Sequence, residues 1–294
     1  MEMPMIDRAL IAELRDHADR ENTGRELAAT PVEGLSVMRR RVATPVEPVV
    51  YEPVLCLVME GVKEVWHGDR PLRFAAGQSS VISFHLPTQA RILEAPYTSL
   101  GLRIDPPLLH EIAAEIDGAD EGAVGPVIST GEADEAVLGA MSRLFRLKNT
   151  PAAIPQLAPL IKRELHYWLL NSCHGPALRE LARPASHAAR IARATAEIRR
   201  TYDAQLRVPE LARGAGMSET TFHAQFKALT GTTPLQFQKK MRLMEARRLI
   251  EAGGQGVSQA AFAVGYESPT QFSREFSRMF GCAPSRLKPE AASA

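Results

Sequence analysis

The sequence predicts an α+β fold with a strand-rich N-terminal part and an all-helical C-terminal part. In the first part, Leu100, Leu102 and Ile104 alternate with Gly101 and Arg103, which is the period of a strand with one buried face. Beyond residue 106 the hydrophobic period becomes helical. In about the last hundred residues, a short pattern occurs twice at a constant offset.

Length and composition fit a folded protein of two domains. At roughly 100 to 200 residues per domain, 294 residues suffice for two separate cores. Hydrophobic residues make up 45% and charged residues 23% of the chain, which argues against a disordered, collagen-like or coiled-coil protein.

The chain carries no signal for a membrane or an oxidising compartment. No apolar run approaches the roughly 18 to 20 residues of a membrane helix, and Asp7 and Arg8 stand where a signal peptide is apolar. The three cysteines are widely spaced without a CxxC pair, so neither a disulfide framework nor a zinc site is supported. We therefore expect a cytoplasmic protein with no membrane partner.

The two parts carry opposite charge. Residues 188–294 hold sixteen Lys and Arg against nine Asp and Glu, a balance of +7, whereas residues 1–187 hold nineteen against twenty-five, a balance of −6. A basic part attached to an acidic remainder favours a polyanion as the partner of the basic part. Charge alone does not distinguish DNA from RNA or a membrane surface.

The N-terminal part reads as one helix followed by short strands. A polar helix is predicted over 8–21, and prolines punctuate the extended region after it. Strands are predicted over 54–59, where Glu60-Gly61 ends the apolar run, over Val65-Trp66 before the turn signal His67-Gly68-Asp69, and over 80–84. Short strands at this spacing suggest a small sheet or barrel.

Three helices are predicted next, over 106–116, 131–147 and 157–171. The last has an apolar stripe that serves either as core or as a candidate dimer surface: Leu157, Leu160, Ile161, Leu165 and Trp168. Gly175-Pro176 and Arg183-Pro184 bracket a loose connection, so we predict two domains, residues 1–186 and 187–294.

The repeat is the strongest pattern in the sequence. Five identities recur at an offset of fifty residues: Ser218, Phe222, Phe226, Gly231 and Pro234 become Ser268, Phe272, Phe276, Gly281 and Pro284. Each copy has the parts of a helix-turn-helix unit, namely a short helix (209–215 or 258–264), a glycine turn and a second helix capped by serine. Two homologous units are implied.

Within each second helix, the phenylalanines four apart lie on one face and predict core packing. In the second unit, Gln271 stands where it completes a reciprocal cap with Ser268. The residues on the other side of each helix, around and between the phenylalanines, are then exposed, and they are polar or small, as contact with base edges or phosphates requires. They are Glu219, Thr220, His223, Ala224 and Lys227 in the first unit and Thr270, Gln271, Arg274 and Arg278 in the second.

About the last hundred residues resemble the AraC/XylS-type transcription regulators. The resemblance is carried by "LARGAGMSETTFHAQFKALTGTTP", "RLMEARRLI" and "AAFAVGYESPTQFSREFSRMFGCAP", in the order and spacing of that family's bipartite DNA-binding signature. It implies that one long helix, here 235–252, joins the two units and holds both recognition helices toward successive major grooves. A duplex turn of about 34 Å permits this geometry.

The resemblance also implies the base-contacting positions. They are Thr220, His223 and Ala224 in the first unit and Thr270, Gln271 and Arg274 in the second, within DNA-binding surfaces that also include Ser218, Lys227, Ser268 and Arg278. Ala224 departs from relatives that carry arginine there, because alanine offers at most an apolar contact to a thymine methyl group. Arg274 is the candidate for a bidentate guanine contact.

Residues 45–116 resemble the N-terminal domain of one subgroup of these regulators, through "PVLCLVMEGVKEVWHGD" and "SFHLPTQARILEAPYTSLGLRID". Such domains are commonly cupin-like barrels that sense a small molecule or mediate dimerisation. The candidate effector-lining residues are the few polarisable or hydrogen-bonding side chains in or beside the strands: Cys56, Trp66, His85 and Tyr97. Cys56 adds a redox or electrophile option if its thiolate is accessible.

Two other readings stay open. A cupin-like enzyme would use His67, His85 and Glu94 around a metal, but the HxH pair of a cupin metal site is absent, so we expect no enzyme, no metal and no cofactor. An architectural DNA-binding protein would show more lysine and arginine on its recognition helices. The expected partners are a double-stranded DNA operator, RNA polymerase, a small-molecule effector and a second copy of the chain.

Overall fold

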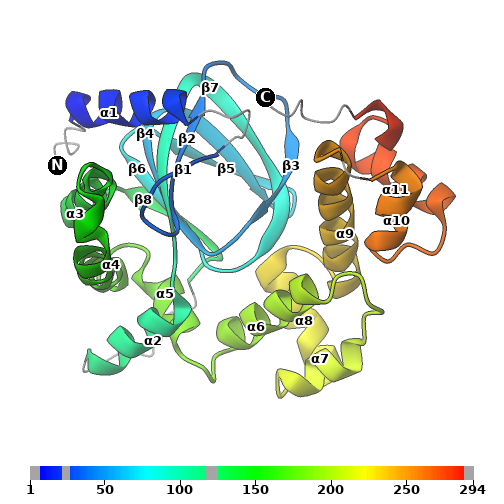
Figure 1. Ribbon diagram of the computed structural model, residues 1–294. Coiled ribbons are helices and arrows are strands. Elements are labelled where there is room, and N and C mark those ends of the chain that lie inside the picture. Colours follow the sequence, from blue (N-terminus) through cyan, green and yellow to red (C-terminus); the bar gives the residue numbers. More distant parts are fainter. Residues whose placement is uncertain (1–6, 22–26, 117–124, 254, 288–294) are drawn as a thin grey trace.

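A curved sheet lies between two groups of helices in the computed structural model, which describes residues 7–21, 27–116, 125–253 and 255–287 (Figure 1). The helices of the first group cover one side of the sheet and those of the second group lie on the other side. This arrangement confirms the predicted α+β class. The first group comprises α1 (Arg8–Arg20), α2 (Pro106–Glu115), α3 (Glu135–Arg146), α4 (Ile154–Leu170) and α5 (Gly175–Ala182), and the second comprises α6 to α11, beginning with α6 (His187–Arg200).

The sheet is antiparallel and is organised around two long strands, β4 (Val54–His67) and β7 (Leu86–Arg103). Each changes neighbours half-way along, so that two half-sheets share the same central pair. One half adds β1 (Leu27–Ala29), β2 (Leu35–Arg40), β6 (Gln78–Ile82) and β8 (Ile128–Glu132), and the other adds β3 (Glu47–Tyr51) and β5 (Arg70–Ala75).

The bend between the half-sheets lies where the register of β4 against β7 shifts, between Val58 and Lys63. Gly61 stands there with φ +74°, and a Cβ atom at this position would lie 2.4 Å from the carbonyl oxygen of Glu94. Only glycine fits such a conformation and such a close approach. The prediction that Glu60-Gly61 ends the strand is therefore wrong, because the pair forms a bulge and the strand continues to His67.

Two predictions on the helices are also wrong. Gly131 and Glu132 belong to β8, paired with β6, and α3 begins only at Glu135 behind an Asp134 cap. The predicted loose connection after Gly175 is the helix α5, whose first turn tolerates Pro176 because no intrahelical N–H is lost there. In both cases a helical or loop pattern in the sequence is overridden by pairing or packing with distant elements.

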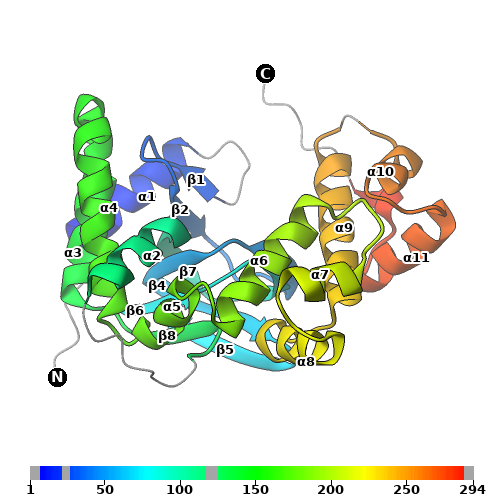
Figure 2. The ribbon, with the colours of Figure 1, turned by 90° about the horizontal axis from the view of Figure 1, so that it is seen from below.

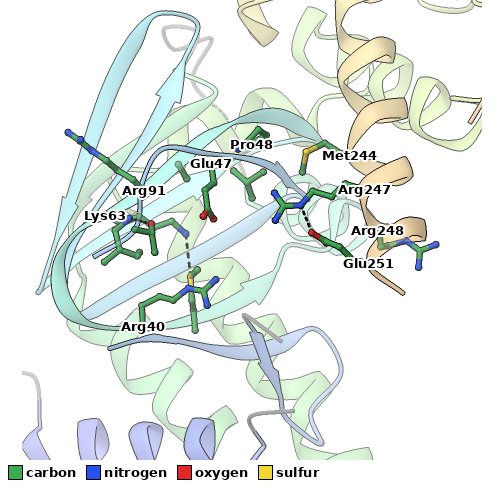
Figure 3. Close-up of a pocket in the computed structure, with 14 residues that line it drawn as sticks. Arg40, Glu47, Pro48, Lys63, Arg91, Met244, Arg247, Arg248 and Glu251 are labelled. Atoms are coloured by element: carbon green, nitrogen blue, oxygen red, sulfur yellow. Dashed lines mark hydrogen bonds and ion pairs between the residues drawn. The ribbon is translucent and has the colours of Figure 1, made fainter. Parts of the chain in front are cut away.

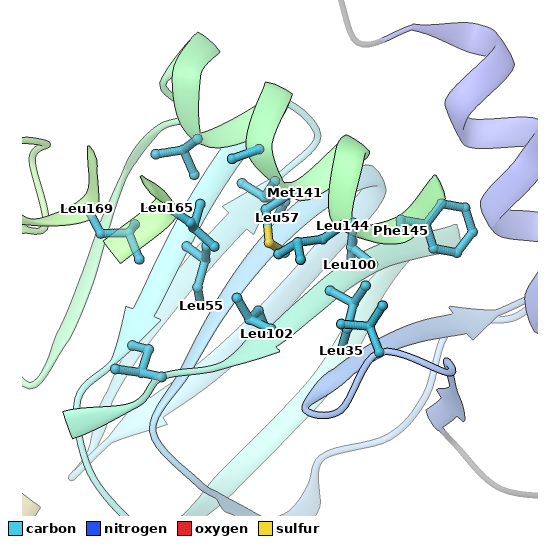
Figure 4. Close-up of a cluster of buried hydrophobic side chains, with 14 of the residues drawn as sticks. Leu35, Leu55, Leu57, Leu100, Leu102, Met141, Leu144, Phe145, Leu165 and Leu169 are labelled. Carbon is cyan, nitrogen blue, oxygen red and sulfur yellow. The ribbon is translucent and has the colours of Figure 1, made fainter. Parts of the chain in front are cut away.

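The first core lies between the sheet and helices α1 to α5. Leucines of β2, β4 and β7 point toward α3 and α4, where Met141, Leu144, Phe145, Leu165 and Leu169 meet them (Figure 4). All five of these helical side chains are fully buried. Leu165 of the predicted stripe is thus core, while Leu157, Leu160 and Trp168 remain exposed.

Two further cores divide the second group of helices. One runs continuously from the sheet, including Val65, Phe84 and Ile92, into the helices that follow residue 187, including Phe226 and Phe237. The other is confined to the C-terminal end of the chain around Phe272 and Phe276. The first helix-turn-helix region therefore shares a core with the sheet, whereas the second has a core of its own.

A buried histidine ties β6 and β8 to the turn before α5. The Ser79 hydroxyl lies 2.8 Å from Nε2 of His174 and the Ser129 hydroxyl lies 2.7 Å from Nδ1. Burial lowers the pKa of His174 from its ordinary value of 6.5 to about 4. The neutral ring is therefore the form that the folded protein favours.

We expect the free energy of unfolding to fall as the pH drops from about 6.5 to 4, because in this window the unfolded chain takes up a proton that folded His174 does not. The loss from this residue alone is about 3 kcal/mol at most. Denaturant unfolding at several pH values measures it. In His174→Leu the slope over this window should become shallower than in the wild-type protein. Equal slopes in the two proteins would contradict the assignment.

Candidate nucleic-acid interface

The C-terminal helices form two three-helix units. The first consists of α6, α7 (Val208–Gly214) and α8 (Glu219–Thr230), and the second of α9 (Pro234–Glu251), α10 (Val257–Ala263) and α11 (Pro269–Phe280). Helix α9 stands between the first unit and the α10–α11 pair (Figure 2). The repeat in the sequence thus folds as two similar units, and α9 is the predicted long helix.

The last helix of each unit, α8 or α11, begins and ends at residues that the repeat preserves. The hydroxyls of Ser218 and Ser268 accept hydrogen bonds from the backbone N–H groups of Thr221 and Gln271, at 3.2 and 3.3 Å. At the other end, Gly231 and Gly281 both have φ +71°, the left-handed conformation that ends helices. Similar caps at both ends give α8 and α11 the same length of 12 residues.

The predicted reciprocal cap of α11 is wrong. The side chain of Gln271 turns along the helix and donates to Glu275 at 3.2 Å. Glu275 also accepts from Lys239 at 2.8 Å and from the Tyr266 hydroxyl at 2.7 Å. Burial raises the pKa of Glu275, but these three donors outweigh it and the pKa is lowered overall. The resulting carboxylate holds Gln271 in place more strongly than a backbone N–H would.

The aromatic pairs of the repeat fill the cores beneath the recognition helices. Phe222 and Phe226 have ring centroids 5.6 Å apart, and Phe272 and Phe276 have centroids 5.4 Å apart. All four rings are fully buried. Helices α8 and α11 therefore each keep one face inward, as predicted, and expose the opposite face to solvent.

The structure brings the predicted DNA-contacting residues together on the outer faces of α8 and α11. All are exposed except Ser268, which is half-buried: Ser218, Thr220, His223, Ala224 and Lys227 on the first helix and Thr270, Gln271, Arg274 and Arg278 on the second. Within the described ranges, no ion pair engages Arg274, Arg278 or Lys227. Their charges are available to an anionic partner, and their role in DNA contact stays a prediction.

Two arginines that the sequence did not predict as functional hold the turns of the two units. Arg190 of α6 donates to the carbonyl oxygens of Ala215 and Gly216, both at 3.2 Å, and so holds the turn of the first unit. Arg242 of α9 donates to the carbonyl of Gly265, at 2.7 Å, in the turn of the second unit. The two arginines are 52 positions apart and the two glycines 49. The fifty-residue offset therefore could not reveal their equivalence.

Cys56 and Tyr97, two of the candidate effector-lining residues, do lie together. A cavity of about 560 Å³ opens between β2, β3, β4 and β7, and Cys56 lines it beside Val50, Val54 and Lys63. The Tyr97 hydroxyl lies behind, 3.9 Å from the sulfur of Cys56. Burial raises the pKa of Tyr97, so its phenol stays neutral.

The other two candidates lie elsewhere. Trp66 stands near the end of β4, where the guanidinium of Arg91 lies 5.7 Å from its ring centroid. His85 lines two separate cavities near Glu52 and Arg199, and its Nδ1 atom has no hydrogen-bond partner in the described part of the chain. Burial lowers the pKa of His85, and the nearby Arg199 lowers it further. The sequence did not separate these positions because alternation gives a face of a strand but not the place of a cavity.

A second cavity, of about 420 Å³, lies between the sheet and α9 (Figure 3). Lys63 and Arg40 line its sheet side, and Arg247 of α9 extends toward Glu47 across it. This cavity shares Met38, Val49 and Lys63 with the larger apolar one. Lys63 is only 8% exposed, and its ammonium lies 3.4 Å from the sulfur of Met38 and 5.3 Å from the ring centroid of Tyr51. A buried cation thus stands where an apolar cavity meets a polar one.

Neither a metal-binding cluster nor a membrane-spanning helix occurs among the described residues. No three His, Cys, Asp or Glu side chains gather where they could hold a metal ion. Of the helices in these ranges, none has the length and apolar character needed to span a bilayer.

The comparisons with known proteins agree with the fold and the repeat. The profile of a family described as "AraC-type transcriptional regulator N-terminus" matches residues 31–177, which is half of the chain. The chain belongs to the AraC/XylS-type transcription regulators. A helix-turn-helix domain profile matches residues 211–289. The resemblance seen in the sequence is confirmed for both parts.

Two curated relatives each match about a third of this AraC/XylS-type protein. The MmsAB operon regulatory protein of Pseudomonas aeruginosa is 34% identical over 93 residues, 32% of this chain and 30% of that protein. The transcriptional activator RhaS of Pectobacterium carotovorum is 30% identical over 94 residues, 32% of this chain and 34% of that protein. The chain thus spans about a third of the length of these relatives.

Among solved structures, ToxT of Vibrio cholerae has the same two-part fold. An apo form superposes with a TM-score of 0.59 over 87% of this chain and 98% of that one, at 10% identity. A form of ToxT with a bound unsaturated fatty acid superposes with a TM-score of 0.56, covering 86% and 92% of the two chains at 10% identity. The predicted layout of a sheet domain followed by two helix-turn-helix units is confirmed.

Proposed function

We propose that this protein is a transcription regulator that binds DNA sequence-specifically through α8 and α11 and senses a small organic ligand through its sheet domain. The observation that carries the proposal is the pair of capped helices with their exposed Thr, Gln and Arg side chains. These side chain types recognise base edges in the major groove, and a pair of such helices addresses two groove segments. The balance of +7 beyond residue 187 supplies the attraction to phosphates.

We expect the full chain to select a defined duplex from a random pool and to bind it in a salt-dependent manner. If about six phosphates are neutralised, log affinity should fall against log salt with a slope near roughly −5. Fluorescence anisotropy at several salt concentrations measures this slope on the selected and on a shuffled duplex. Equal affinity for both duplexes would favour an architectural DNA-binding protein, and binding independent of salt would refute phosphate contact.

For the ligand, we propose a carboxylic acid with an apolar body. The apolar cavity beside Cys56 adjoins the polar one through Lys63, so a carboxylate placed at Lys63 leaves the rest of the molecule among Val50, Val54 and Met38. A charge-assisted hydrogen bond at such a site contributes about 1.5 to 3 kcal/mol. That ToxT has been solved with an unsaturated fatty acid supports this ligand class, because the two proteins share the fold.

The matching test compares an unsaturated fatty acid with the alcohol of the same chain length by calorimetry. The wild-type protein should prefer the acid, and Lys63→Met should lose about tenfold in affinity for the acid while keeping that for the alcohol. Lys148→Met is the control, because Lys148 lies against Phe145, which packs in the separate core under α1 to α5. Acid binding that survives Lys63→Met would exclude Lys63 as the carboxylate partner.

We further propose that α4 mediates dimerisation. Its outer face exposes Leu157, Leu160, Tyr167 and Trp168, at 38% for Trp168 up to 64% for Leu160. The helix stands on the side of the molecule away from α10 and α11 (Figure 2). A second copy bound there would leave the recognition faces free, and an apolar patch on a helix is typical of such an interface.

Replacing Leu160 and Trp168 by polar residues should give folded monomers that bind a two-copy DNA site more weakly than the wild-type protein does. Sedimentation velocity reports the oligomeric state, and circular dichroism the fold. Leu165→Gln is the contrasting variant. Because Leu165 is fully buried in the core beneath α4, this replacement should destabilise the fold itself. A double variant that is still dimeric would place the contact elsewhere.

A further inference from the structure

One arginine bridges the two helix-turn-helix units by hydrogen bonds. Arg242, near the middle of α9, donates hydrogen bonds to four carbonyl oxygens on two different segments. Its Nε donates to Tyr202 at 2.6 Å, and its Nη2 donates to Asp203 at 3.2 Å and to Ala204 at 2.9 Å, all in the loop between α6 and α7. Its Nη1 donates to Gly265, in the turn between α10 and α11. One guanidinium therefore joins a loop of the first unit to the turn of the second.

The backbones of the two units also touch at this place. A Cβ atom on Gly265 would lie 2.1 Å from the carbonyl oxygen of Asp203, so only glycine allows the turn to approach the loop so closely. Gln238, one helical turn earlier on α9, donates to Ala204 at 2.8 Å and is buried. Tyr202 packs against both C-terminal cores, the one shared with the sheet and the one around Phe276. We call this contact of Arg242 with residues 202–204 and Gly265 the joint. Its hydrogen bonds and close backbone approach define one arrangement of the two segments.

The guanidinium suits this task. Its donors form a rigid planar fork, which fixes the direction of each carbonyl that accepts from it. Lysine would supply the same charge, but from a single flexible ammonium group. Arg190 holds the turn of the first unit through two carbonyls of that unit alone, whereas Arg242 reaches across the boundary between the units.

We propose that Arg242 is a positioning residue that sets the distance and angle between α8 and α11, and through them the spacing of the two DNA segments that the protein prefers. The proposal rests on the DNA-binding function proposed above. Because α8 belongs to the core shared with the sheet and α11 to the separate core, the joint at Arg242 and the continuous helix α9 fix one recognition helix relative to the other. B-DNA turns by about 35° per base pair, so a small rotation at this joint changes which spacing fits.

The first test needs no DNA. Spin labels carried by non-natural side chains at Ala228 of α8 and Ala263 of α10, both exposed, report the distance between the units in the full chain. We expect one narrow distance distribution for the wild-type protein and a broadened one for Arg242→Met, which keeps the length of the stem but has no donors. Arg242→Lys should broaden it nearly as much, because the charge remains without the fork. A distribution unchanged in both variants would overturn the proposal.

The second test uses the duplex that the wild-type chain selects, with two base pairs inserted between its two contacted segments. The insertion rotates one segment by about 70° and should weaken wild-type binding by roughly tenfold or more. Arg242→Met should bind the parent and the inserted duplex within about threefold of each other. The matched control is Arg248→Ala on the same helix, because its exposed guanidinium pairs with Glu245 at 2.6 Å and with no other carboxylate of the described residues. It should behave as the wild-type protein does.

The outcomes separate the two proposals. If the wild-type chain selects no duplex, the DNA-binding function fails while the spin-label result still decides on the joint. If Arg242→Met broadens the distance distribution but keeps the wild-type penalty for the insertion, the joint holds the units without setting DNA spacing, and the proposal is overturned. Circular dichroism and thermal melting of Arg242→Met and Arg242→Lys identify any loss of fold. The milder lysine variant carries the test if the methionine variant does not fold.

Discussion

Replacing Phe276 by alanine should unfold the second helix-turn-helix unit and leave the sheet domain and the first unit folded. Phe276 is fully buried in a core whose buried side chains come from α9, α10, α11 and the turn between α10 and α11, and no described residue of the sheet belongs to it. Removing a buried phenyl ring costs about 3 to 5 kcal/mol, which is a large share of the stability of so small a unit. Hydrogen exchange followed by mass spectrometry should show protection lost in α10 and α11 and retained in β4 and β7.

The equivalent change in the first unit should destabilise a larger part of the protein, including the sheet. Phe226 lies in the core that continues into the sheet, with Phe237 at a centroid distance of 5.4 Å. Phe226→Ala should therefore lower protection in α8 and in the sheet strands that share this core. Phe262→Ala is the surface control in the second unit, since its ring is 57% exposed. If Phe276→Ala removed protection from the sheet as well, the two cores would unfold as one and the division would be wrong.

This division has a consequence for regulation. A ligand bound as proposed in the sheet domain would act on the first unit through a shared core, and on the second unit through the contacts of α9 and α11 with β3 and through the joint at Arg242. Contact between the sheet and the first unit also includes His67, whose Nε2 lies 3.0 Å from the carbonyl oxygen of Leu229 near the end of α8. A ligand shifts such an arrangement only by its difference in affinity between the two states.

The structure of the C-terminal part could be predicted from the sequence because its repeat consists of local signals. Serine N-caps, glycine C-caps and phenylalanines four apart each indicate one feature of a helix. The same residues located the exposed faces of α8 and α11. Arg242 could not be found in this way. Its role depends on carbonyl groups of Tyr202 and Gly265, which any residue supplies, so the sequence holds no pattern for it.

Less of the sheet domain could be predicted from the sequence, because its features also depend on contacts between distant residues. The alternation around Leu100 predicted a strand, but the bend at Gly61, which lets β4 continue to His67, depends on register against β7. Lys63 was not among the effector candidates, because a lysine in a sequence is usually a solvated charge. It is buried here by Met38 and Tyr51 from two other strands, and only the folded sheet brings these residues together.

Arg274→Ala should remove sequence discrimination from the second unit. Arg274 is exposed on α11, and within the described ranges no ion pair engages its guanidinium, so its planar fork can donate to the O6 and N7 atoms of a guanine. The loss should be about 1 to 3 kcal/mol on the preferred duplex and small on a shuffled one. Anisotropy titrations on both duplexes measure the two losses. Arg248→Ala again serves as the control, since it removes an arginine of the same domain that already pairs with Glu245.

The converse change is Ala224→Arg on α8, where the chain has a small side chain at the corresponding recognition surface. Because alanine offers no donor, the wild-type first unit should discriminate less between base pairs than the second. An introduced arginine should create a preference for guanine in the first segment, which site selection with the variant would reveal. If Arg274→Ala weakened both duplexes equally, Arg274 would be a phosphate contact. If Ala224→Arg left the selected sequence unchanged, α8 would enter the groove with a different face, and the contribution of Thr220 and His223 would have to be assigned anew.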